Sequence, residues 1–480
     1  MILFVLALLP TLLGAGLLGR LGLGLRGTRG LELTAGLARA WVLGFLGFGF
    51  VLWGWAWCEL PWRAATLLGT ALVLVLLVSP WLLRGAATRP ACATRGARWE
   101  WRFLTLALVL ALAAHLDRAQ LALLQPITHG DEALIWTAAG KALFASDGYS
   151  DAFGRALAVS VAHPDYPALN PLWQSFVFAL EGAAEPFRGR LPIQAAAVVL
   201  VLLLATSLAR RTRPALAALV VLAVAGLRGA PQLDLVQTAY SDGLVALGLL
   251  LAVDAWLRYF DERRDAWLVV AAAGLALAVF AKNEGQLLAL AFLASALLGS
   301  ASTWLRQRPS GRRVALVLAC VALVALPLVL TATVNAHYQL EGDLFGSANA
   351  AGAPIWVTLP AQLSERGSLV VGYLARHVVF APRTGGAWFL VLALLALGRP
   401  RVLCAPRLAI PTLTLAAAVL GFTLIFIGSA HHLGRGPGAE LWHLDTAAAR
   451  VFGQLVPAAA LIAATALGAR AQQDSGSAST

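Results

Sequence analysis

Apolar segments long enough to cross a lipid bilayer recur along the whole chain of 480 residues. Residues 1–19 and 314–335 are two of the clearest, with no acidic or basic side chain in either run. A run of about 20 apolar residues spans the hydrocarbon core as a helix, because a helix satisfies its own backbone hydrogen bonds. Hydrophobic residues make up 60% of the chain and charged residues 12%. A soluble domain cannot bury that much apolar surface, so we predict an all-α polytopic membrane protein.

We assign about 13 transmembrane helices to these runs. The expected ranges are 1–19, 38–57, 64–83, 103–125, 190–209, 214–230, 243–260, 266–281, 286–303, 314–335, 386–398, 409–429 and 449–469. Residues 366–385 are expected to form either one more span or an interfacial helix. The first run lacks a basic region and a small-residue cleavage site, so we expect a retained helix and no signal peptide.

Arginines gather in one set of short connections between the expected helices. The positive-inside rule assigns such connections to the cytoplasm, which puts the N-terminus outside and the C-terminus in the cytoplasm. The same rule explains the net charge of +12 without a nucleic-acid partner. The opposite, outer face then carries long loops at about 126–189 and 336–385 and a shorter one at 430–448. Juxtamembrane helices are expected in the first of these loops.

Two adjacent carboxylates, Asp131 and Glu132, open the first outer loop directly after an apolar helix. Acidic residues at a helix start can simply favour the helix dipole. Charged residues near membrane depth are also costly and are usually functional. The pair is therefore a candidate catalytic site.

Two further polar clusters lie on the predicted outer face. The sequence HPDYP, with His163 and Tyr166, predicts a rigid turn before a short interfacial helix, and its side chains could also contact a ligand. Asp242 begins a later helix, where it could act as an N-terminal cap or as a second acid at the site.

Cationic candidates follow on the same face. Lys282 and Glu284 lie in a short turn between two apolar helices, where they could pair with each other. A lysine at the membrane surface is also a ready ligand for a lipid phosphate. Arg450, at the start of the last expected span, is a similar candidate. The alternative is that its side chain simply extends to the membrane interface and binds no ligand.

The order of these clusters is more specific than any one of them. GDEALIW, HPDYPALNP, AYSDG and AKNEG follow one another along the chain. This order resembles the GT-C superfamily of integral-membrane glycosyltransferases, which includes the protein O-mannosyltransferases and the aminoarabinose lipid A transferases. The resemblance covers roughly residues 103–300, and the C-terminal third matches only loosely.

The resemblance implies an inverting transfer of a sugar from a polyprenyl-phosphate donor to a lipid, glycan or protein acceptor on the outer face. A carboxylate would act as general base, and cations would stabilise the phosphate leaving group. The implied catalytic residues are Asp131, with Glu132 as substitute. The implied phosphate-binding residues are Lys282 and Arg450, and the implied substrate-pocket residues are His163, Tyr166, Asp242 and Glu284. No cofactor or metal is expected, since dispersed acids do not define a metal site. The implied location is a bacterial inner membrane.

The same comparison divides the chain into four parts. Residues 1–102 would form a three-helix membrane extension, because four expected helices precede the acidic loop where the family usually has one. Residues 103–300 would form the catalytic core, and residues 301–470 the C-terminal helices. A disordered tail would cover 471–480, which is polar and rich in Ser.

Two other classes of membrane protein compete with this interpretation. A transporter or lipid flippase usually carries its ionisable groups near the bilayer midplane on broken helices in repeated halves. This chain shows no internal repeat, and its charges cluster at one surface. An O-antigen ligase or polymerase relies on a late outer loop rich in Arg and His. His431, His432, Arg435 and His443 favour that class, whereas the early acidic loop does not.

Overall fold

The computed structural model is all-helical in the residues that it describes. These residues are 2–25, 28, 30–82, 96–127, 130–226, 237–306, 310–340, 355–380, 386–398, 400–429 and 441–477. The prediction of an all-α polytopic fold is confirmed. His431, His432 and Arg435 lie outside the described residues, as do 478–480 of the expected tail.

Four long helices begin the chain and are followed by short ones. They are α1 (Ile2–Arg20), α2 (Leu31–Trp57), α3 (Ala64–Leu82), α4 (Arg98–Leu124), η1 (Glu132–Thr137), α5 (Ala138–Ala145), α6 (Asp151–Ser160), α7 (Leu169–Glu181) and η2 (Arg188–Arg190). The central part contains α8 (Leu191–Arg211), α9 (Pro214–Val221), η3 (Leu222–Gly226), α11 (Asp242–Glu262), α12 (Ala266–Ala281), α13 (Asn283–Arg306) and α14 (Gly311–Tyr338). The last part contains α15 (Ile355–Leu374), η4 (Ala375–Val379), α16 (Ala387–Leu397), α17 (Pro400–Leu403), α18 (Pro406–Gly428), η7 (Leu444–Ala448), α19 (Ala449–Gly453) and α20 (Val456–Ser477).

Each of the 13 expected apolar segments coincides with described helix. Eight helices in the described part of the chain are long and apolar enough to span a membrane. A ninth span arises if the bent pair Leu444–Gly453 and Val456–Ala469 is counted as one. The remaining four expected spans fall on shorter apolar helices, Pro214–Gly226, Ala266–Ala281, Asn283–Gly299 and Ala387–Leu397. Pro214–Gly226, Ala266–Ala281 and Ala387–Leu397, as described, are too short for a full perpendicular crossing, which takes about 20 residues at 1.5 Å per residue. The helix that contains Asn283–Gly299 continues to Arg306.

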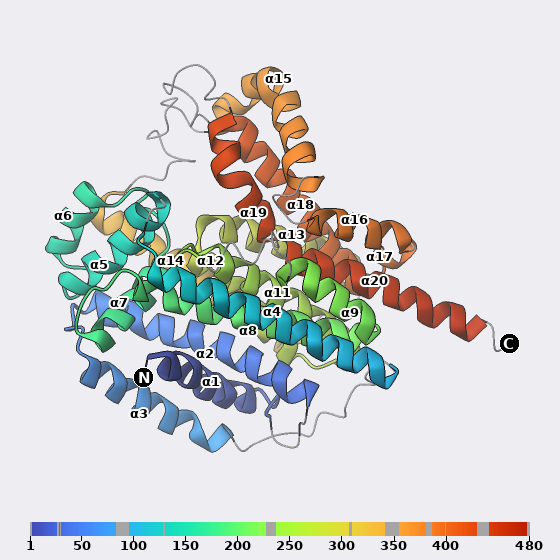
Figure 1. Cartoon of the computed structure of the whole chain (residues 1–480), viewed down its shortest axis with the longest axis horizontal. Coiled ribbons are helices and arrows are strands. Elements are labelled where there is room, and N and C mark those ends of the chain that lie inside the picture. The colour runs from blue at the N-terminus through green and yellow to red at the C-terminus, as the bar shows by residue number, and fades with distance from the viewer. Residues whose placement is uncertain are drawn as a thin grey trace.

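Most of the helices run along a common direction, which is horizontal in Figure 1. Helices α5, α6 and α7 gather at the left end of this bundle, whereas α15 and α19 rise from it. We name the end of the bundle that carries Asp131 the Asp131 end, and the opposite end the Asp254 end. Helices η1, α5, α6 and α7 confirm the expected helices in the first long loop.

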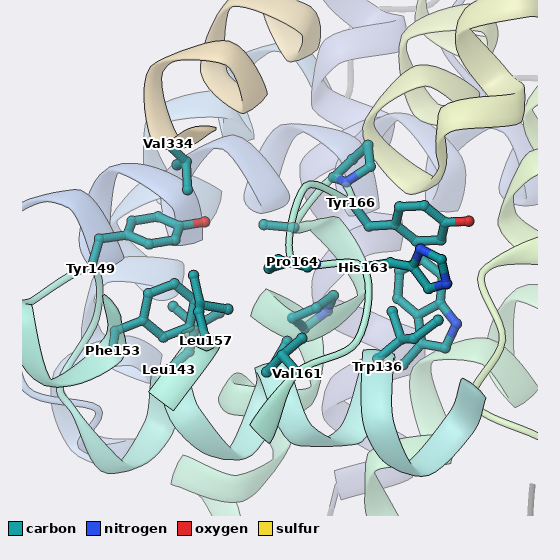
Figure 2. Close-up of a pocket in the computed structure, with 15 residues that line it drawn as sticks. Trp136, Leu143, Tyr149, Phe153, Leu157, Val161, His163, Pro164, Tyr166 and Val334 are labelled. Atoms are coloured by element: carbon teal, nitrogen blue, oxygen red, sulfur yellow. The ribbon is translucent and has the colours of Figure 1, made fainter. Parts of the chain in front are cut away.

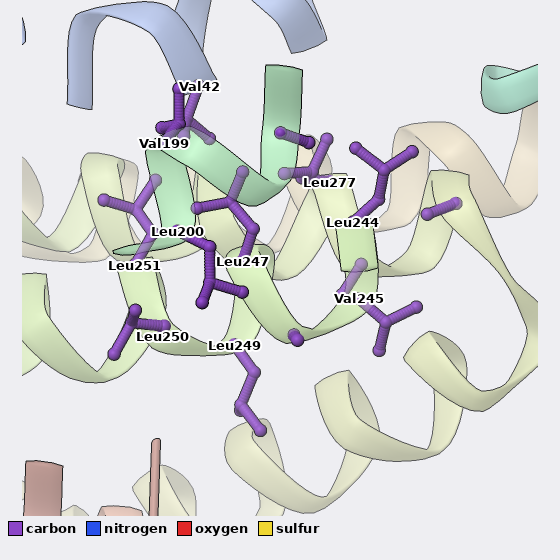
Figure 3. Packing of buried hydrophobic residues seen from close by; sticks show 14 of the residues in the cluster. Val42, Val199, Leu200, Leu244, Val245, Leu247, Leu249, Leu250, Leu251 and Leu277 are labelled. Atoms are coloured by element: carbon purple, nitrogen blue, oxygen red, sulfur yellow. The ribbon is translucent and has the colours of Figure 1, made fainter. Parts of the chain in front are cut away.

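The core lies where α8, α11 and α12 pack against α2, as Figure 3 shows. Leu200 and Leu247 are among the side chains buried there. The backbones of α11 and α12 approach closely at a pair of glycines. A Cβ atom added to Gly248 would lie 2.5 Å from the Gly274 carbonyl oxygen, so only glycine fits. Small residues at such crossings are how membrane helices pack tightly.

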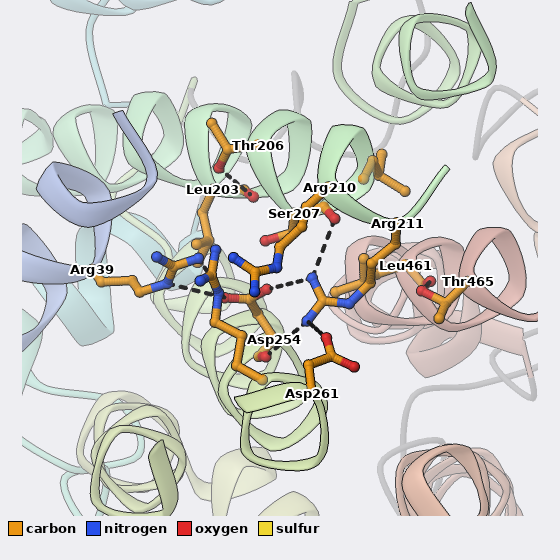
Figure 4. A network of polar contacts seen from close by, with 12 residues as sticks. Arg39, Leu203, Thr206, Ser207, Arg210, Arg211, Asp254, Asp261, Leu461 and Thr465 are labelled. Carbon is orange, nitrogen blue, oxygen red and sulfur yellow. Dashed lines mark hydrogen bonds and ion pairs between the residues drawn. The ribbon is translucent and has the colours of Figure 1, made fainter. Parts of the chain in front are cut away.

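A buried network of charges closes the Asp254 end (Figure 4). Asp254 on α11 is fully buried and accepts hydrogen bonds from Arg39 Nη2 at 2.9 Å and Arg211 Nη1 at 3.0 Å. Arg210 on α8 donates to Glu32 at 2.8 Å and to Glu262 at 2.8 Å. Opposite charges thus compensate one another, which is the condition for burying them.

This network joins helices far apart in the sequence. Arg39 comes from α2, in the first 102 residues that we expected to be an added extension. In the middle of α2, Phe45 stacks on Trp173 of α7 with ring centroids 4.2 Å apart. Through these two contacts, α2 is part of the core packing. At the other terminus, α20 continues to Ser477 and covers most of the expected disordered tail.

Candidate functional site

Asp131 lies immediately before η1, and its side chain is 49% exposed. One of its carboxylate oxygens accepts a hydrogen bond from Arg450 Nη2 at 3.0 Å. Arg450 lies on α19, and its guanidinium lies over the Tyr240 ring, 4.1 Å from the ring centroid. The fold therefore joins the start of the first long loop to the last membrane helix pair.

Asp242 is the first residue of α11 and is fully buried. Its Oδ1 accepts a hydrogen bond from Lys282 Nζ at 3.1 Å, and its Oδ2 lies 3.9 Å from Arg450 Nη1. Lys282 ends α12 and also pairs with Glu284, with 2.7 Å between Nζ and Oε1. Asp131, Arg450, Asp242, Lys282 and Glu284 thus form one continuous chain of ion pairs, which we call the acid–base cluster.

Glu132 points away from the acid–base cluster, although it is adjacent to Asp131. It is fully buried, and Arg190 binds both of its carboxylate oxygens, at 2.5 Å and 2.9 Å. The Ala239 N–H donates to the same carboxylate at 2.9 Å. Arg190 also donates to the carbonyl oxygens of Ala122 and Gln125. Glu132 therefore ties the first loop to α4, α8 and the segment before α11.

The HPDYP turn packs beside the turn that contains Lys282. Asn283 donates to Asp165 Oδ2 at 3.1 Å, and Asn335 on α14 donates to the Asp165 carbonyl oxygen at 3.3 Å. Tyr166 packs against Trp136 with ring centroids 5.5 Å apart. Burial raises the pKa of Tyr166 well above its ordinary value, and the nearby carboxylates Glu284 and Asp165 raise it further. Tyr166 is consequently a neutral hydroxyl at physiological pH.

His163 and Tyr166 line an apolar pocket (Figure 2). Its other walls come from α5, α6, the start of α7 and Val334 of α14. We expected both residues in one substrate pocket with Asp242 and Glu284. Those two acids do not line this pocket, so the structure separates the expected set into an apolar pocket and the acid–base cluster. Trp136 and Tyr166 lie in the wall of the apolar pocket. The charges of Asp131 and Arg450, in the acid–base cluster, act on the Tyr166 hydroxyl.

Three polar residues of the site were missed at the level of sequence. Arg190 lies at the start of α8, where an arginine between apolar segments needs a carboxylate partner. Gln454 is fully buried and donates from Nε2 to Asp242 Oδ1. It is an isolated polar residue in an apolar run, and that isolation was the available signal. Asn170 donates to the Ala239 carbonyl oxygen at 2.6 Å and so supports the segment that binds Glu132.

The described residues contain no group of three or more His, Cys, Asp or Glu side chains that could hold a metal ion. Lys282 and Arg450 compensate the carboxylates of the acid–base cluster instead. Whether the reaction requires a metal or another cofactor stays a prediction from the resemblance.

Residues 165–330 match the model of the dolichyl-phosphate-mannose-protein mannosyltransferase family, which is of GT-C type. The resemblance to the GT-C glycosyltransferases is confirmed. The matched segment begins in the HPDYP turn, ends in α14 and contains Asp242, Lys282 and Glu284. Asp131 and Arg450 lie outside it, on either side. No curated protein and no solved structure matches the chain.

Proposed function

We propose that the protein transfers a sugar from a polyprenyl-phosphate carrier to an acceptor hydroxyl at the membrane surface. The observation that carries this proposal is the acid–base cluster. It joins the half-exposed Asp131 to the cations Lys282 and Arg450 at the same end of the bundle. Sugar transfer needs a carboxylate to remove a proton and cations to stabilise the departing phosphate. The matched family transfers mannose from such a carrier, by its name.

Asp131 is the proposed general base. The acceptor oxygen forms a bond to the anomeric carbon, with inversion, and Asp131 takes the proton of the acceptor hydroxyl. The bond between the anomeric carbon and the phosphate oxygen breaks, and its electron pair leaves with the polyprenyl phosphate. Glu132 is a poor candidate for this role, because its two oxygens are already held by Arg190 and the Ala239 N–H.

Lys282 and Arg450 are the proposed phosphate-binding residues. Lys282 Nζ carries three protons and makes two contacts, with Asp242 and Glu284, which leaves one donor for a phosphate oxygen. The Nε–H of Arg450 is buried and has no hydrogen-bond partner among the described residues. Both cations can therefore bind an anion while keeping the ion pairs that position them.

Replacing Asp131 tests the assignment. We expect Asp131→Asn to lower transfer by about 10²- to 10⁴-fold, the usual contribution of a positioned proton acceptor. The assay follows label from polyprenyl-phosphate sugars into membrane acceptors, with equal amounts of purified protein. Asp151→Asn is the matched control, because Asp151 is an exposed acid in the first turn of α6 in the same loop. Near-normal transfer by Asp131→Asn would rule out Asp131 as the base.

We further propose that the Asp131 end faces outward, toward the periplasm of a bacterial inner membrane, with the C-terminus in the cytoplasm. The bias of arginines supports this orientation. Two exposed cysteines test it, Cys58 at the end of α2 and Cys404 between α17 and α18. In single-cysteine variants in intact cells, an impermeant maleimide should label Cys58 and spare Cys404 until the cells are opened. The reverse labelling would invert the proposed topology.

A further inference from the structure

Gln454 lies at a break in the last membrane helix pair. The segments Leu444–Gly453 and Val456–Ala469 are bent by 43° relative to each other. Pro457 has no N–H and cannot donate to the carbonyl of Gly453, so the helix hydrogen-bond ladder is interrupted there. Gln454, just before the break, is a polar side chain that is fully buried.

The amide of Gln454 and the ammonium of Lys282 share one oxygen. Asp242 Oδ1 accepts from Gln454 Nε2 and from Lys282 Nζ, the latter at 3.1 Å. An amide donates a hydrogen bond without adding a positive charge. Gln454 can therefore fix the orientation of the Asp242 carboxylate while Lys282 is the cation on that oxygen.

Several buried polar atoms around this contact have no hydrogen-bond partner among the described residues. They are Asp242 Oδ2, Glu284 Oε2, Arg450 Nε and Gln454 Oε1. Buried polar atoms are nearly always paired, so such a group of atoms requires an explanation. A ligand that carries hydroxyl groups and an anionic oxygen would supply partners for these acceptors and for the donor.

We propose that Gln454 is a positioning residue of the sugar-transfer site. Through Asp242, it holds the Lys282 ammonium where the donor phosphate binds. The inference rests on the proposed function and extends it to the C-terminal helix pair, outside the segment that matches the mannosyltransferase family.

Two substitutions of Gln454 test the proposal. Gln454→Leu removes the donor to Asp242 at similar volume. We expect its kcat/KM for the polyprenyl-phosphate sugar to fall about 10- to 100-fold, the range for losing a hydrogen bond to a charged group. The apparent KM of the donor should rise more than kcat falls, because a misplaced Lys282 affects phosphate binding first. The matched control is Gln194→Leu, since Gln194 on α8 is also buried and donates to the carbonyl of Ala119, away from the acid–base cluster.

Gln454→Glu gives a readout that a purely structural role would not change. It brings a second carboxylate against Asp242, beside Lys282 and Arg450. Two adjacent carboxylates share a proton at low pH and repel when both are ionised. When protonated, the new side chain can donate to Asp242 as the amide does. Activity should therefore recover as the pH falls and be lost as the pH rises through the upper pKa of the pair, in contrast to the wild type.

The outcomes separate the two proposals. If wild-type protein transfers no sugar from any polyprenyl-phosphate donor, the proposed function fails, and this inference fails with it. If wild type transfers sugar, and Gln454→Leu behaves as Gln194→Leu, the positioning role alone is wrong. Should Gln454→Leu fail to fold, the pH profile of Gln454→Glu decides. Recovery at low pH supports the role, and a profile parallel to wild type refutes it.

Discussion

The buried pair of Glu132 and Arg190 allows a structural carboxylate to be distinguished from a catalytic one by experiment. The proposed perturbation is Glu132→Ala. It removes both acceptors of the Arg190 guanidinium and the acceptor of the Ala239 N–H. Breaking a buried ion pair by removing one partner costs about 3–5 kcal/mol, because the remaining charge is left uncompensated. An unpaired buried backbone N–H costs about 1–3 kcal/mol more.

Arg190 retains part of its hydrogen bonding in this variant. It still donates to the carbonyl oxygens of Ala122 and Gln125, which compensates some of the loss. We therefore expect a net loss of about 3–5 kcal/mol in the free energy of unfolding, toward the lower end of the combined cost. Since folded proteins are stable by about 5–15 kcal/mol, this is a large share of the total.

The measurement is unfolding of purified protein in detergent, followed by tryptophan fluorescence. A double-mutant cycle with Arg190→Met isolates the pair, because the double variant leaves no buried charge behind. We expect the double variant to be clearly more stable than the sum of the single losses predicts. Asp131→Ala is the matched control. In the pair of Asp131 with Arg450 the aspartate side chain is half-exposed, and such pairs contribute about 0–1 kcal/mol. Wild-type stability of Glu132→Ala, together with lost transfer, would refute the structural role and return Glu132 to the list of candidate bases.

Two further predictions concern ionisable side chains, Asp254 and Tyr240. Asp254→Asn should lower the free energy of unfolding by about 3–5 kcal/mol, because three arginines lose part of their charge compensation. The kcat per folded molecule should stay at the wild-type level. A stable variant with reduced kcat would contradict this prediction. Burial raises the pKa of Tyr240 to about 12, so its phenol should stay neutral through pH 10 and its contribution to stability should be lost as the pH rises toward 12. The difference in absorbance at 295 nm between wild type and Tyr240→Phe should show its step near pH 12, and a step near pH 10 would exclude the buried environment.

The positions of the membrane helices could be predicted from the sequence because hydropathy is a local property. Every expected apolar range coincides with helix in its described residues, even the 16 residues Ala266–Ala281, which are too few for a full perpendicular crossing. Such a helix can be short because protein covers it on most sides. Whether an apolar helix faces lipid or other helices depends on tertiary packing, which the local amino-acid sequence does not specify.

The members of the site could be predicted in part. Asp131, Asp242, Lys282, Glu284 and Arg450 were expected on one face, and they lie in one chain of ion pairs. The separate directions of Asp131 and Glu132 could not be predicted, since the partner of Glu132 lies 58 residues away. Gln454 was missed for the same reason, because 212 residues separate it from Asp242. Long-range partners of this kind follow from the fold and leave no local pattern.

Helix α11 carries two fully buried aspartates, and their surroundings argue for different roles. Just past the middle of the helix, both oxygens of Asp254 are bound by arginine hydrogen bonds. At the start of the helix, Asp242 Oδ1 has two donors, whereas Oδ2 has a cation 3.9 Å away and no hydrogen bond from the described residues. A carboxylate whose oxygens are both satisfied stabilises the packing of helices and has little left to offer a substrate. A carboxylate with one oxygen unsatisfied, next to an unsatisfied guanidinium N–H, can still bind a substrate. On this ground the Asp254 end is the structural anchor of the bundle, and the Asp131 end is where we expect the chemistry.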